Sequence, residues 1–383
     1  MVYRVKANPK MIRWAREDAG YEFDELPKSL ANAPLWESGK VQPTWTDLRN
    51  LANKYKRPPV FYLMSETPKD EDDHIIEFRS EEKIEDYSSE LRLEIRKAKY
   101  RRNAFINLNS EMGFTLPNFS NKKISTNNSS IFAEKLRKIL NVSFESQKEW
   151  ILNDNKKKKY DHSIFLYNWK EIVHNLGILV FETEDVSEGE MSGLSLYHDI
   201  CPIILLNGKN TPNRRIFTLI HELAHIFMGK STICDVDKKN RKETFCNKVA
   251  AETLVPLPLK DEQIFYKKGT IKLGSLSHEY GVSKQVIILR LYALNKVSKE
   301  FKDLTLKEIE LHNKEQKRKK KERNKNSDGG GMSILTKKRK YEGKPYSRFM
   351  LNAYENRVIS STKFMRYLDL PIDAVNSLYD LVY

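Results

Sequence analysis

The sequence predicts an α+β fold, in which a small sheet and several helices form one unit that helical segments flank. Two apolar runs without charges, residues 176–181 and 202–206, have the length and composition of buried strands. After them, apolar residues recur at the three- and four-residue spacing of a helix, most clearly over residues 211–229. We therefore expect one mixed unit of strands and helices over residues 163–297.

The first segment, residues 1–66, is expected to form a separate domain of short helices. Apolar residues at helical spacing over residues 11–19 are followed by Gly20, which favours a helix end. A second helix is expected at about residues 23–30. The stretch from residue 36 to residue 52 then resembles the end of the helix-turn-helix domains of the XRE repressor family.

This resemblance is incomplete at the helix that would contact DNA bases. Fewer residues separate Leu26 from Trp36 than the family's turn and recognition helix need, and Pro34 lies within the shortened piece. Proline cannot donate the hydrogen bond that a helix interior requires. We therefore expect a domain that descends from a DNA binder but serves in protein interaction or packing rather than in reading bases.

Residues 67–162 are expected to be a charged, mainly helical connector. Helical patterns over residues 89–106 and 130–140 lie on either side of a loop rich in Asn and Ser, residues 118–129. We find no residue pattern in this connector that indicates chemistry.

The mixed unit is expected to begin with residues 164–166 as a short strand, followed by a helix and by the strand over residues 176–181. The strand over residues 202–206 can lie at a sheet edge, where a substrate peptide could add a further strand, or it can be fully paired in the core. The unit should end with two helices over residues 273–294, separated by a turn at residues 281–283.

One predicted helix of this unit carries the pattern that indicates chemistry. Thr211 can cap its start, and Gly229 can end it in the left-handed conformation. His221 and His225 stand four residues apart, so both imidazoles project from one face and can bind one zinc ion. Glu222 is one position round the helix, beside the metal rather than on it, where a carboxylate can act as a general base.

Two imidazoles alone hold zinc weakly, so a third protein ligand is expected on a neighbouring helix. The candidates downstream are Asp235, Glu243, Cys246 and Glu252. Three protein ligands leave the fourth position open, as in catalytic zinc sites. The alternative is a pair of core histidines bonded to backbone or carboxylate groups, which needs no metal.

Two stretches around these residues match a known pattern. They are R-R-x-F-T-L-x-H-E-x-x-H, which ends at His225, and E-T-x-C-N-x-x-A-A-x-x-L-x-P, which begins at Glu243. Together they resemble the ImmA/IrrE family of metallopeptidases. The resemblance implies a zincin-like domain with Zn²⁺ held by His221, His225 and Glu243. Asn247 would assist these ligands, because it lies one helical turn from Glu243 on the same face, whereas Glu252 lies about two and a half turns on.

The same resemblance implies a function. Longer members of the family also carry an XRE-like domain and a C-terminal segment similar to residues 343–368. The implied activity is that of a zinc-dependent endopeptidase that cleaves a helix-turn-helix repressor or a similar regulator, in a mobile element or a stress response. Glu222 would take a proton from water and return it to the leaving amine. The candidates for stabilising the oxyanion are Tyr197, His198, Tyr280 and Arg290.

The formal net charge of +15 comes largely from basic runs. Residues 314–328 hold eight Lys or Arg against three acids, and shorter runs lie at residues 156–159 and 337–340. Such runs are typical of solvated linkers, so we expect a basic linker over residues 298–331 and a small C-terminal helical domain over residues 332–383. They also allow weak, non-specific DNA binding through phosphates.

The composition further predicts a cytoplasmic protein. Residues 1–10 lack an apolar leader segment, and no apolar run reaches the ~18 residues of a membrane-spanning helix. Three cysteines are too few and too irregularly spaced for a disulfide framework. We expect no membrane partner. The alternative function is a DNA-binding transcriptional regulator in which the zinc site is not catalytic.

Overall fold

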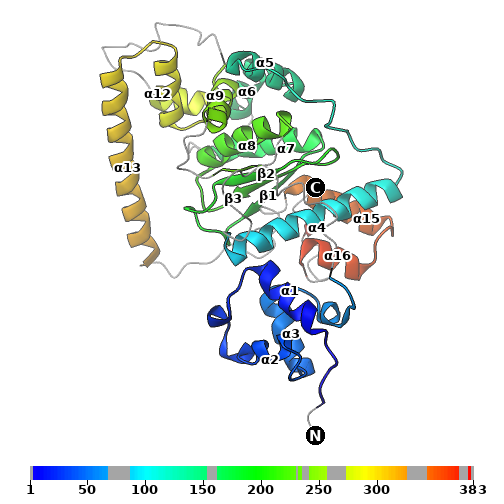
Figure 1. Cartoon of the computed structure of the whole chain (residues 1–383). Helices are drawn as coiled ribbons and strands as arrows, with labels where there is room; N and C mark the ends of the chain where they lie inside the picture. Colours follow the sequence, from blue (N-terminus) through cyan, green and yellow to red (C-terminus); the bar gives the residue numbers. More distant parts are fainter. Residues whose placement is uncertain are drawn as a thin grey trace. The chain divides into compact units, whose positions relative to one another are not determined.

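The computed structural model describes residues 3–67, 87–152, 162–229, 232–234, 241–256, 273–325, 343–370 and 378–380. Their contacts divide the chain into two compact units, Met1–Tyr100 and Arg101–Tyr383. Figure 1 shows the helices and strands of both. In the described part of the chain, no helix is both long and apolar enough to span a membrane.

The amino-terminal unit is built from short helices. Its elements are α1 (Pro9–Ala19), α2 (Ala33–Glu37), α3 (Trp45–Tyr55) and 3-10 turns at Phe23–Glu25, Lys28–Leu30 and Pro59–Leu63. The helix predicted before Gly20 is confirmed as α1, which that glycine ends with a φ of 75°. The helix predicted over residues 23–30 is wrong. Two 3-10 turns occupy that stretch, and Pro27, which has no N–H to donate, separates them.

Two local interactions hold the helices of this unit in place. Arg16 Nε of α1 donates to Glu37 Oε1 of α2 at 2.8 Å, and both side chains are buried. At the start of α3, the Asp47 N–H donates to Thr44 Oγ1 at 3.1 Å, and the Thr44 N–H donates to Asp47 Oδ2 at 2.8 Å. This reciprocal cap satisfies two amides that a helix start leaves without a partner.

The second unit contains a four-stranded sheet with the order β1-β3-β2-β4. Its strands are β1 (Leu179–Thr183), β2 (Gly193–Leu196), β3 (Ile203–Asn207) and β4 (Thr232–Cys234). β1 runs parallel to β3, while β2 runs antiparallel to β3 and to β4. β3 therefore lies inside the sheet with a partner on each side. The expectation that this strand could accept a substrate strand at an edge is wrong, and the fully paired alternative is confirmed.

The two apolar runs predicted as strands are confirmed as β1 and β3, with slightly shifted ends. Residues 164–166 do not form a strand. They lie in α7 (Ser163–Asn175), where Phe165 and Leu166 are buried on one face. A short apolar run fits either a strand or a buried helix turn, so periodicity alone could not decide between them.

Helices account for most of the second unit. They are α4 (Ser89–Glu111), which begins in the first unit, α5 (Ser129–Leu140), α6 (Phe144–Leu152), α7, α8 (Pro212–Phe227), α9 (Arg241–Leu254), α11 (Leu273–Tyr280), α12 (Lys284–Ala293), α13 (Lys299–Lys325), α15 (Lys344–Glu355) and α16 (Ser361–Leu368). The predicted helical patterns before and after the 118–129 loop are confirmed as α4 and α5. The predicted helix, turn and helix over residues 273–294 is confirmed as α11 and α12.

The two faces of the sheet are covered by different helices. α7 and α8 lie over one face (Figure 1), where Val180 of β1 and Ile204 of β3 enter the large hydrophobic core of this unit. On the opposite face, the Phe181 ring meets the Tyr346 ring of α15 at 5.4 Å between centroids. The Arg101 guanidinium also lies 5.3 Å from the Phe181 ring. After its first turn, helix α8 is largely buried, without a break from Thr218 to Phe227.

A buried charged network fixes the start of α8. Glu182 of β1 accepts hydrogen bonds from Lys170 Nζ of α7 at 3.0 Å and from Arg215 Nη1 of α8 at 2.5 Å. All three side chains are largely or fully buried. Removing one member would leave the others as uncompensated buried charge, which is strongly destabilising. The network thus sets the position of α8 relative to the sheet.

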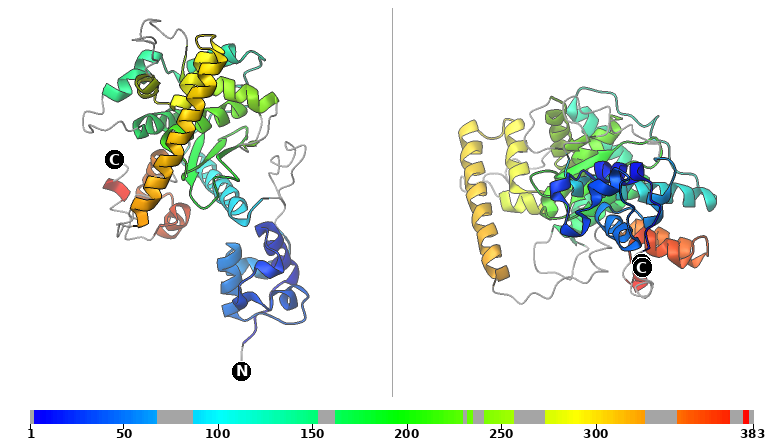
Figure 2. Two further views of the ribbon diagram at one scale, coloured as in Figure 1. Left: turned by 90° about the vertical axis from the view of Figure 1, so that its left-hand side faces the viewer. Right: turned by 60° about the horizontal axis from the view of Figure 1, so that its bottom comes forward.

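The segment predicted as a basic linker is helical over much of its length. α13 packs beside α12 at its start and then continues as a long single helix (Figure 2). Opposite charges one turn apart support it, with Lys314 Nζ 2.6 Å from Glu310 Oε1 and Lys319 Nζ 2.6 Å from Glu315 Oε1. The basic runs at residues 156–159 and 337–340 lie outside the described residues.

Candidate metal centre

Helix α8 has the start and end that its sequence predicts. Thr211 is the N-cap residue with an extended backbone, although its side chain bonds to none of the first-turn amides of the described helix. Pro212 occupies the first turn, where its missing N–H costs nothing. Gly229 follows the helix with a φ of 72°. Between these ends, His221, Glu222 and His225 are all buried.

The two histidines of α8 converge on one glutamate of α9. His221 Nε2 lies 3.1 Å from Glu243 Oε2 and 3.1 Å from His225 Nε2. His225 Nε2 lies 3.3 Å from Glu243 Oε1. One ligand atom from each residue falls within 4.8 Å of the others. Two imidazole nitrogens and a carboxylate oxygen that meet in this way form the donor set of a catalytic zinc site, so the residues fit that metal.

Packing of α9 on α8 brings Glu243 to this position. Val249, Ala250 and Leu254 of α9 are buried in the same hydrophobic core as Leu219 and Leu223 of α8. These residues follow helical spacing, so they place one face of α9 against α8. Glu243 lies at the exposed start of that helix, where its side chain can reach the two imidazoles.

The electrostatic environment of His221, His225 and Glu243 favours binding of a cation. Burial opposes ionisation of the Glu243 carboxyl, but its contacts with His221 and His225 outweigh burial and hold its pKa below the usual range. Burial likewise lowers the pKa of His221, yet the neighbouring Glu243 and Glu222 carboxylates produce a net rise in that pKa. The cluster therefore concentrates negative charge at the point where the imidazole nitrogens meet.

Asn247 and Cys246 each contact one histidine. The Asn247 side chain adds a hydrogen bond to His221, which contributes to the raised pKa of that histidine. Cys246 Sγ lies 3.7 Å from His225 Nδ1. That nitrogen is on the opposite side of the ring from Nε2, which faces Glu243. Cys246 therefore lies behind His225 and does not join the three converging ligand atoms.

The remaining ligand candidates are accounted for as follows. Glu252 Oε1 accepts a hydrogen bond from Arg290 Nη1 at 3.0 Å, near the far end of α9. It does not belong to the group formed by His221, His225 and Glu243. Asp235 lies outside the described residues. Among the described candidates, Glu243 alone meets both histidines.

Glu222 projects from α8 where strand β2 comes close. A methyl group at Gly193, the first residue of β2, would lie 2.4 Å from Thr218 Cγ2 and 3.5 Å from Glu222 Cγ. Such a contact with Thr218 is too short for any real side chain, so the strand can approach only with glycine. Sequence reasoning missed Gly193. Its signal, a glycine within a short apolar stretch that marks close backbone approach, was present.

The four oxyanion candidates lie in two different places. Tyr197 Oη donates to Asp199 Oδ1 at 2.9 Å, and His198 Nδ1 accepts from the Ile200 N–H at 3.1 Å. Both therefore contribute to the turn after β2. The other two, Tyr280 and Arg290, lie toward the far end of α9, where Arg290 bonds to Glu252 and the Tyr280 ring stacks on Phe144. The structure does not bring Tyr280 and Arg290 together with Glu222.

Comparison with known proteins gives one match. No curated protein and no solved structure matches the chain. The family model Peptidase_M78, described as the IrrE N-terminal-like domain, matches residues 173–292, a range that includes α8, α9 and the sheet. In agreement with the resemblance seen in the two motifs, residues 173–292 are thus similar to the IrrE N-terminal-like domain of a peptidase family.

Proposed function

We propose that the chain is a zinc-dependent endopeptidase in which His221, His225 and Glu243 hold zinc and Glu222 is the general base. One observation carries the proposal. Three ligand atoms from two helices lie within 4.8 Å of one another, while the intervening Glu222 stays outside that group. A purely structural zinc site would normally close with a fourth protein ligand and would have no use for a base beside it.

In the proposed reaction, the metal and the side chains of the protein have different roles. When bound, zinc supplies a Lewis acid that polarises a peptide carbonyl and makes water more acidic. Glu222 accepts the proton of the attacking water and passes it to the leaving amine nitrogen. Its burial beside Gly193 restricts the positions that the side chain can take. Glu243 lies 3.1 Å from His221 Nε2, and in this proposal Asn247 helps to keep that ring in position.

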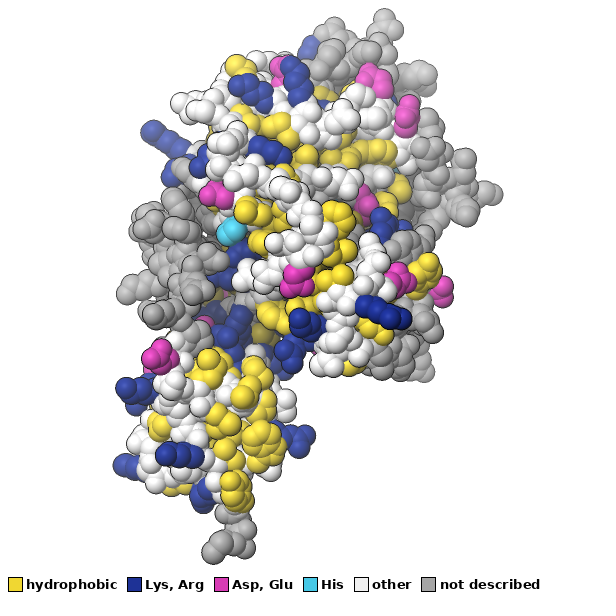
Figure 3. Space-filling model, turned by 90° about the vertical axis from the view of Figure 1, so that its right-hand side faces the viewer, with side chains coloured by type: hydrophobic (Ala, Val, Ile, Leu, Met, Phe, Trp, Pro, Cys, Tyr) yellow, Lys and Arg dark blue, Asp and Glu magenta, His cyan; other side chains and the backbone are white. Residues whose placement is uncertain are grey.

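The proposed substrate is a helix-turn-helix repressor or a similar regulatory protein in the cytoplasm, by analogy with the ImmA/IrrE family. The amino-terminal unit would recognise this substrate or restrain the protease. Support comes from its surface, where Trp45, Val60, Leu63 and Met64 are exposed. Figure 3 shows hydrophobic side chains gathered on one face of this unit, with Lys and Arg at its edges. Clustered exposed apolar groups are typical of protein contact sites.

The same unit is poorly suited to reading DNA bases. α2 spans only Ala33–Glu37 and begins with Pro34 in its first turn. A recognition helix normally enters the major groove with several base-contacting side chains along its length. We infer an XRE-like ancestry with weak, non-specific DNA association through basic segments such as that in α13.

A direct test uses purified, zinc-loaded protein and the repressor-like protein encoded nearest to its gene. Intact-mass spectrometry should detect two complementary fragments, and a chelator should prevent their formation until zinc is restored. A Glu222→Gln preparation with full zinc content serves as the matched control, because it alters the base and no ligand. Fragments that form equally fast with that control would reject the proposed mechanism.

A further inference from the structure

The side chain of Cys246 contacts a proposed metal ligand on the side of the ring that faces away from the other ligands. Its Sγ lies 3.7 Å from His225 Nδ1, which is a hydrogen-bonding distance for sulfur. Cys246 is fully buried and His225 is 1% exposed, so the contact is shielded from solvent. The fold therefore places a polarisable sulfur directly behind one of the two histidines.

Both ring nitrogens of His225 meet side chains of α9. Glu243 Oε1 lies 3.3 Å from Nε2, while Cys246 Sγ lies at Nδ1. Glu243 and Cys246 are three residues apart on the helix, so both project from one face of α9 toward α8. The orientation of the His225 ring thus depends on this one face of α9.

Metal binding at Nε2 decides where the proton of the His225 ring must lie. A neutral imidazole has one N–H, and the nitrogen that binds a metal must offer its lone pair. Because Nε2 faces the other ligands, the proton belongs on Nδ1, where Cys246 Sγ can accept it. Histidines that bind metals usually donate this second N–H to an acceptor, which fixes the orientation of the ring.

A thiol suits this position because of the packing around it. Cys246 belongs to the large hydrophobic core of the second unit, together with Val249 and Ala250 of the same helix. A buried hydroxyl is costly unless it is well hydrogen-bonded, whereas a thiol behaves as a small apolar group that can still accept a weak hydrogen bond. Cysteine therefore fills the core and also provides an acceptor for the Nδ1–H group.

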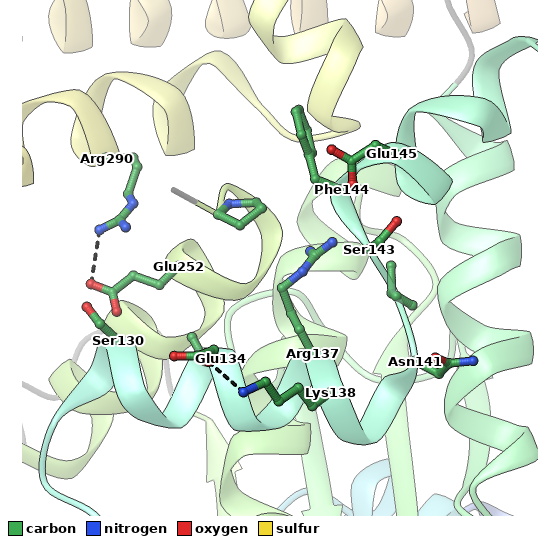
Figure 4. A pocket seen from close by; sticks show the side chains of 13 residues that line it. Ser130, Glu134, Arg137, Lys138, Asn141, Ser143, Phe144, Glu145, Glu252 and Arg290 are labelled. Carbon is green, nitrogen blue, oxygen red and sulfur yellow. Dashed lines mark hydrogen bonds and ion pairs between the residues drawn. The ribbon is translucent and has the colours of Figure 1, made fainter. Parts of the chain in front are cut away.

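The other end of α9 is anchored without help from Cys246. Glu252 accepts a hydrogen bond from Arg290 Nη1 at 3.0 Å beside a cavity of about 630 Å³, as Figure 4 shows. Arg137 Nη1 of α5 donates to the Thr253 carbonyl oxygen at 2.6 Å. These contacts hold the helix in place, so a substitution at this cysteine should act locally.

We propose that Cys246 is a positioning residue of the metal centre, whose sulfur accepts a hydrogen bond from His225 Nδ1 and so directs Nε2 at the metal. This role rests on the proposed zinc site and adds to it a residue that touches a ligand but not the ion. It also accounts for a cysteine that has suitable chemistry for zinc and yet lies outside the group of three converging ligand atoms.

The zinc affinity of the full-length protein, measured by competition against a chromophoric chelator, tests this role. Two variants remove the acceptor: Cys246→Ala leaves space, and Cys246→Val keeps an apolar side chain of similar size. Each should weaken zinc binding about tenfold, the lower end of the range for such partners, because sulfur is a weak acceptor. Cys246→Ser retains an acceptor and should stay within roughly threefold of wild type.

Val249→Ala is the matched control for packing. It removes two methyl groups from the same core, three residues further along the same helix, and no hydrogen-bond acceptor. It should lower stability and leave the zinc affinity unchanged. If packing alone mattered, Cys246→Ser would bind zinc as weakly as Cys246→Ala, and Cys246→Val would bind it as tightly as wild type. Either result would refute the proposal.

Reconstitution with cobalt(II) gives a readout that does not depend on activity. The ring N–H of a histidine that binds cobalt gives a paramagnetically shifted, exchangeable proton signal in NMR spectra. One such signal of wild type should move or broaden in Cys246→Ala, because its acceptor is lost, and should stay in place in Val249→Ala. An unchanged signal in Cys246→Ala would contradict the proposal. So would a sulfur-to-cobalt charge-transfer band in wild type, since it would identify Cys246 as a ligand.

The outcomes also separate the role of Cys246 from the zinc site itself. Wild type that binds no zinc would reject the metal centre and this role together. Wild type that binds zinc with the same affinity as every Cys246 variant would reject only the role of the cysteine, and His221, His225 and Glu243 would remain the proposed ligands. Affinity is measured rather than zinc content, because a site that is tenfold weaker still fills when zinc is in excess.

Discussion

Helix α9 carries a glutamate near each end, and the two carboxylates face different partners. Glu243 meets two imidazole nitrogens of α8 at 3.1 and 3.3 Å, whereas Glu252 meets the guanidinium of Arg290 at 3.0 Å. The imidazoles can share a metal with a carboxylate, but a guanidinium is always charged and binds no metal. The chemistry of each end is therefore set by the neighbouring helix and not by α9 itself.

This difference separates two tasks on one helix. In the proposed function, the start of α9 supplies a ligand to a metal cation, which would provide the opposite charge. The end of α9 is held within the fold by an ion pair and by Arg137 and Gln147, which donate to the Thr253 and Leu254 carbonyl oxygens. At both ends of α9 a positive charge compensates a carboxylate. Only a metal ion at the start of α9 could be exchanged, because the guanidinium at the other end belongs to Arg290 of the chain. Substitutions at the two ends should consequently have separable effects.

The largest effect, on the rate of peptide cleavage, is expected at Glu222, which lies on α8 and not on α9. Glu222→Gln should lower the rate of peptide cleavage about 10²- to 10⁴-fold, because it removes the general base. Zinc content should stay at the wild-type level, since Glu222 is not among the three converging residues. Cleavage rate and zinc per chain, measured on the same preparation, check both parts. Loss of zinc from this variant would show that Glu222 is itself a metal ligand, which would contradict the roles proposed for Glu222 and Glu243.

At the far end of α9, Glu252→Ala should reduce stability and spare the metal. Arg290 is 6% exposed and would be left without its carboxylate, which costs about 3–5 kcal/mol for a buried pair. Urea denaturation followed by circular dichroism measures the change. Glu308→Ala, at an exposed glutamate on α13, is the control and should stay within about 0.5 kcal/mol of wild type. A variant of unchanged stability would show that the Arg290 pair is not the anchor of this end.

Near the metal end, Asn247→Ala should weaken zinc binding about 10- to 100-fold, because His221 loses a partner that orients its ring. The adjacent Lys248→Ala is the matched control, since that exposed residue is not among the three converging residues. Competition against a chromophoric chelator gives both affinities. Identical values would remove Asn247 from the site.

The smallest effect concerns DNA, which involves neither end of α9. The purified chain should bind duplex DNA weakly and without sequence preference, and the affinity should fall steeply as salt rises, because phosphate contacts release counterions. Fluorescence anisotropy with random and repressor-operator duplexes at several salt concentrations checks this. A defined footprint at physiological salt would instead favour the regulator function and assign base reading to the amino-terminal unit.

The sequence predicted the parts of this molecule that rest on local signals. The apolar pattern of α8 and the spacing of His221 and His225 are local, so the helix and its candidate metal-binding face could be recognised from the sequence. The selection of Glu243 needed the family pattern in addition, because four downstream residues had suitable chemistry. The expected helix over residues 23–30 failed at Pro27, a local signal that was available.

Other features depend on contacts between distant segments and left no local trace. The position of β3 inside the sheet follows from pairing with β1 and β2, which no property of residues 203–207 reveals. The pairing of Arg290 with Glu252 joins two helices that are far apart in sequence. The contact of Cys246 with the outer nitrogen of His225 likewise depends on how α9 turns against α8. Composition and spacing could list these residues but not their partners.

The central claim is that Glu243 is the third metal ligand, and zinc content tests it most directly. Wild type, Glu243→Ala, Glu252→Ala and Cys246→Ala, each reconstituted with zinc and dialysed against a weak chelator, can be compared by inductively coupled plasma mass spectrometry. One zinc per chain is expected in wild type, Glu252→Ala and Cys246→Ala, while Glu243→Ala should lose nearly all of it, because two imidazoles alone remain. Equal zinc content in all four proteins, or loss from Glu252→Ala rather than Glu243→Ala, would contradict the account.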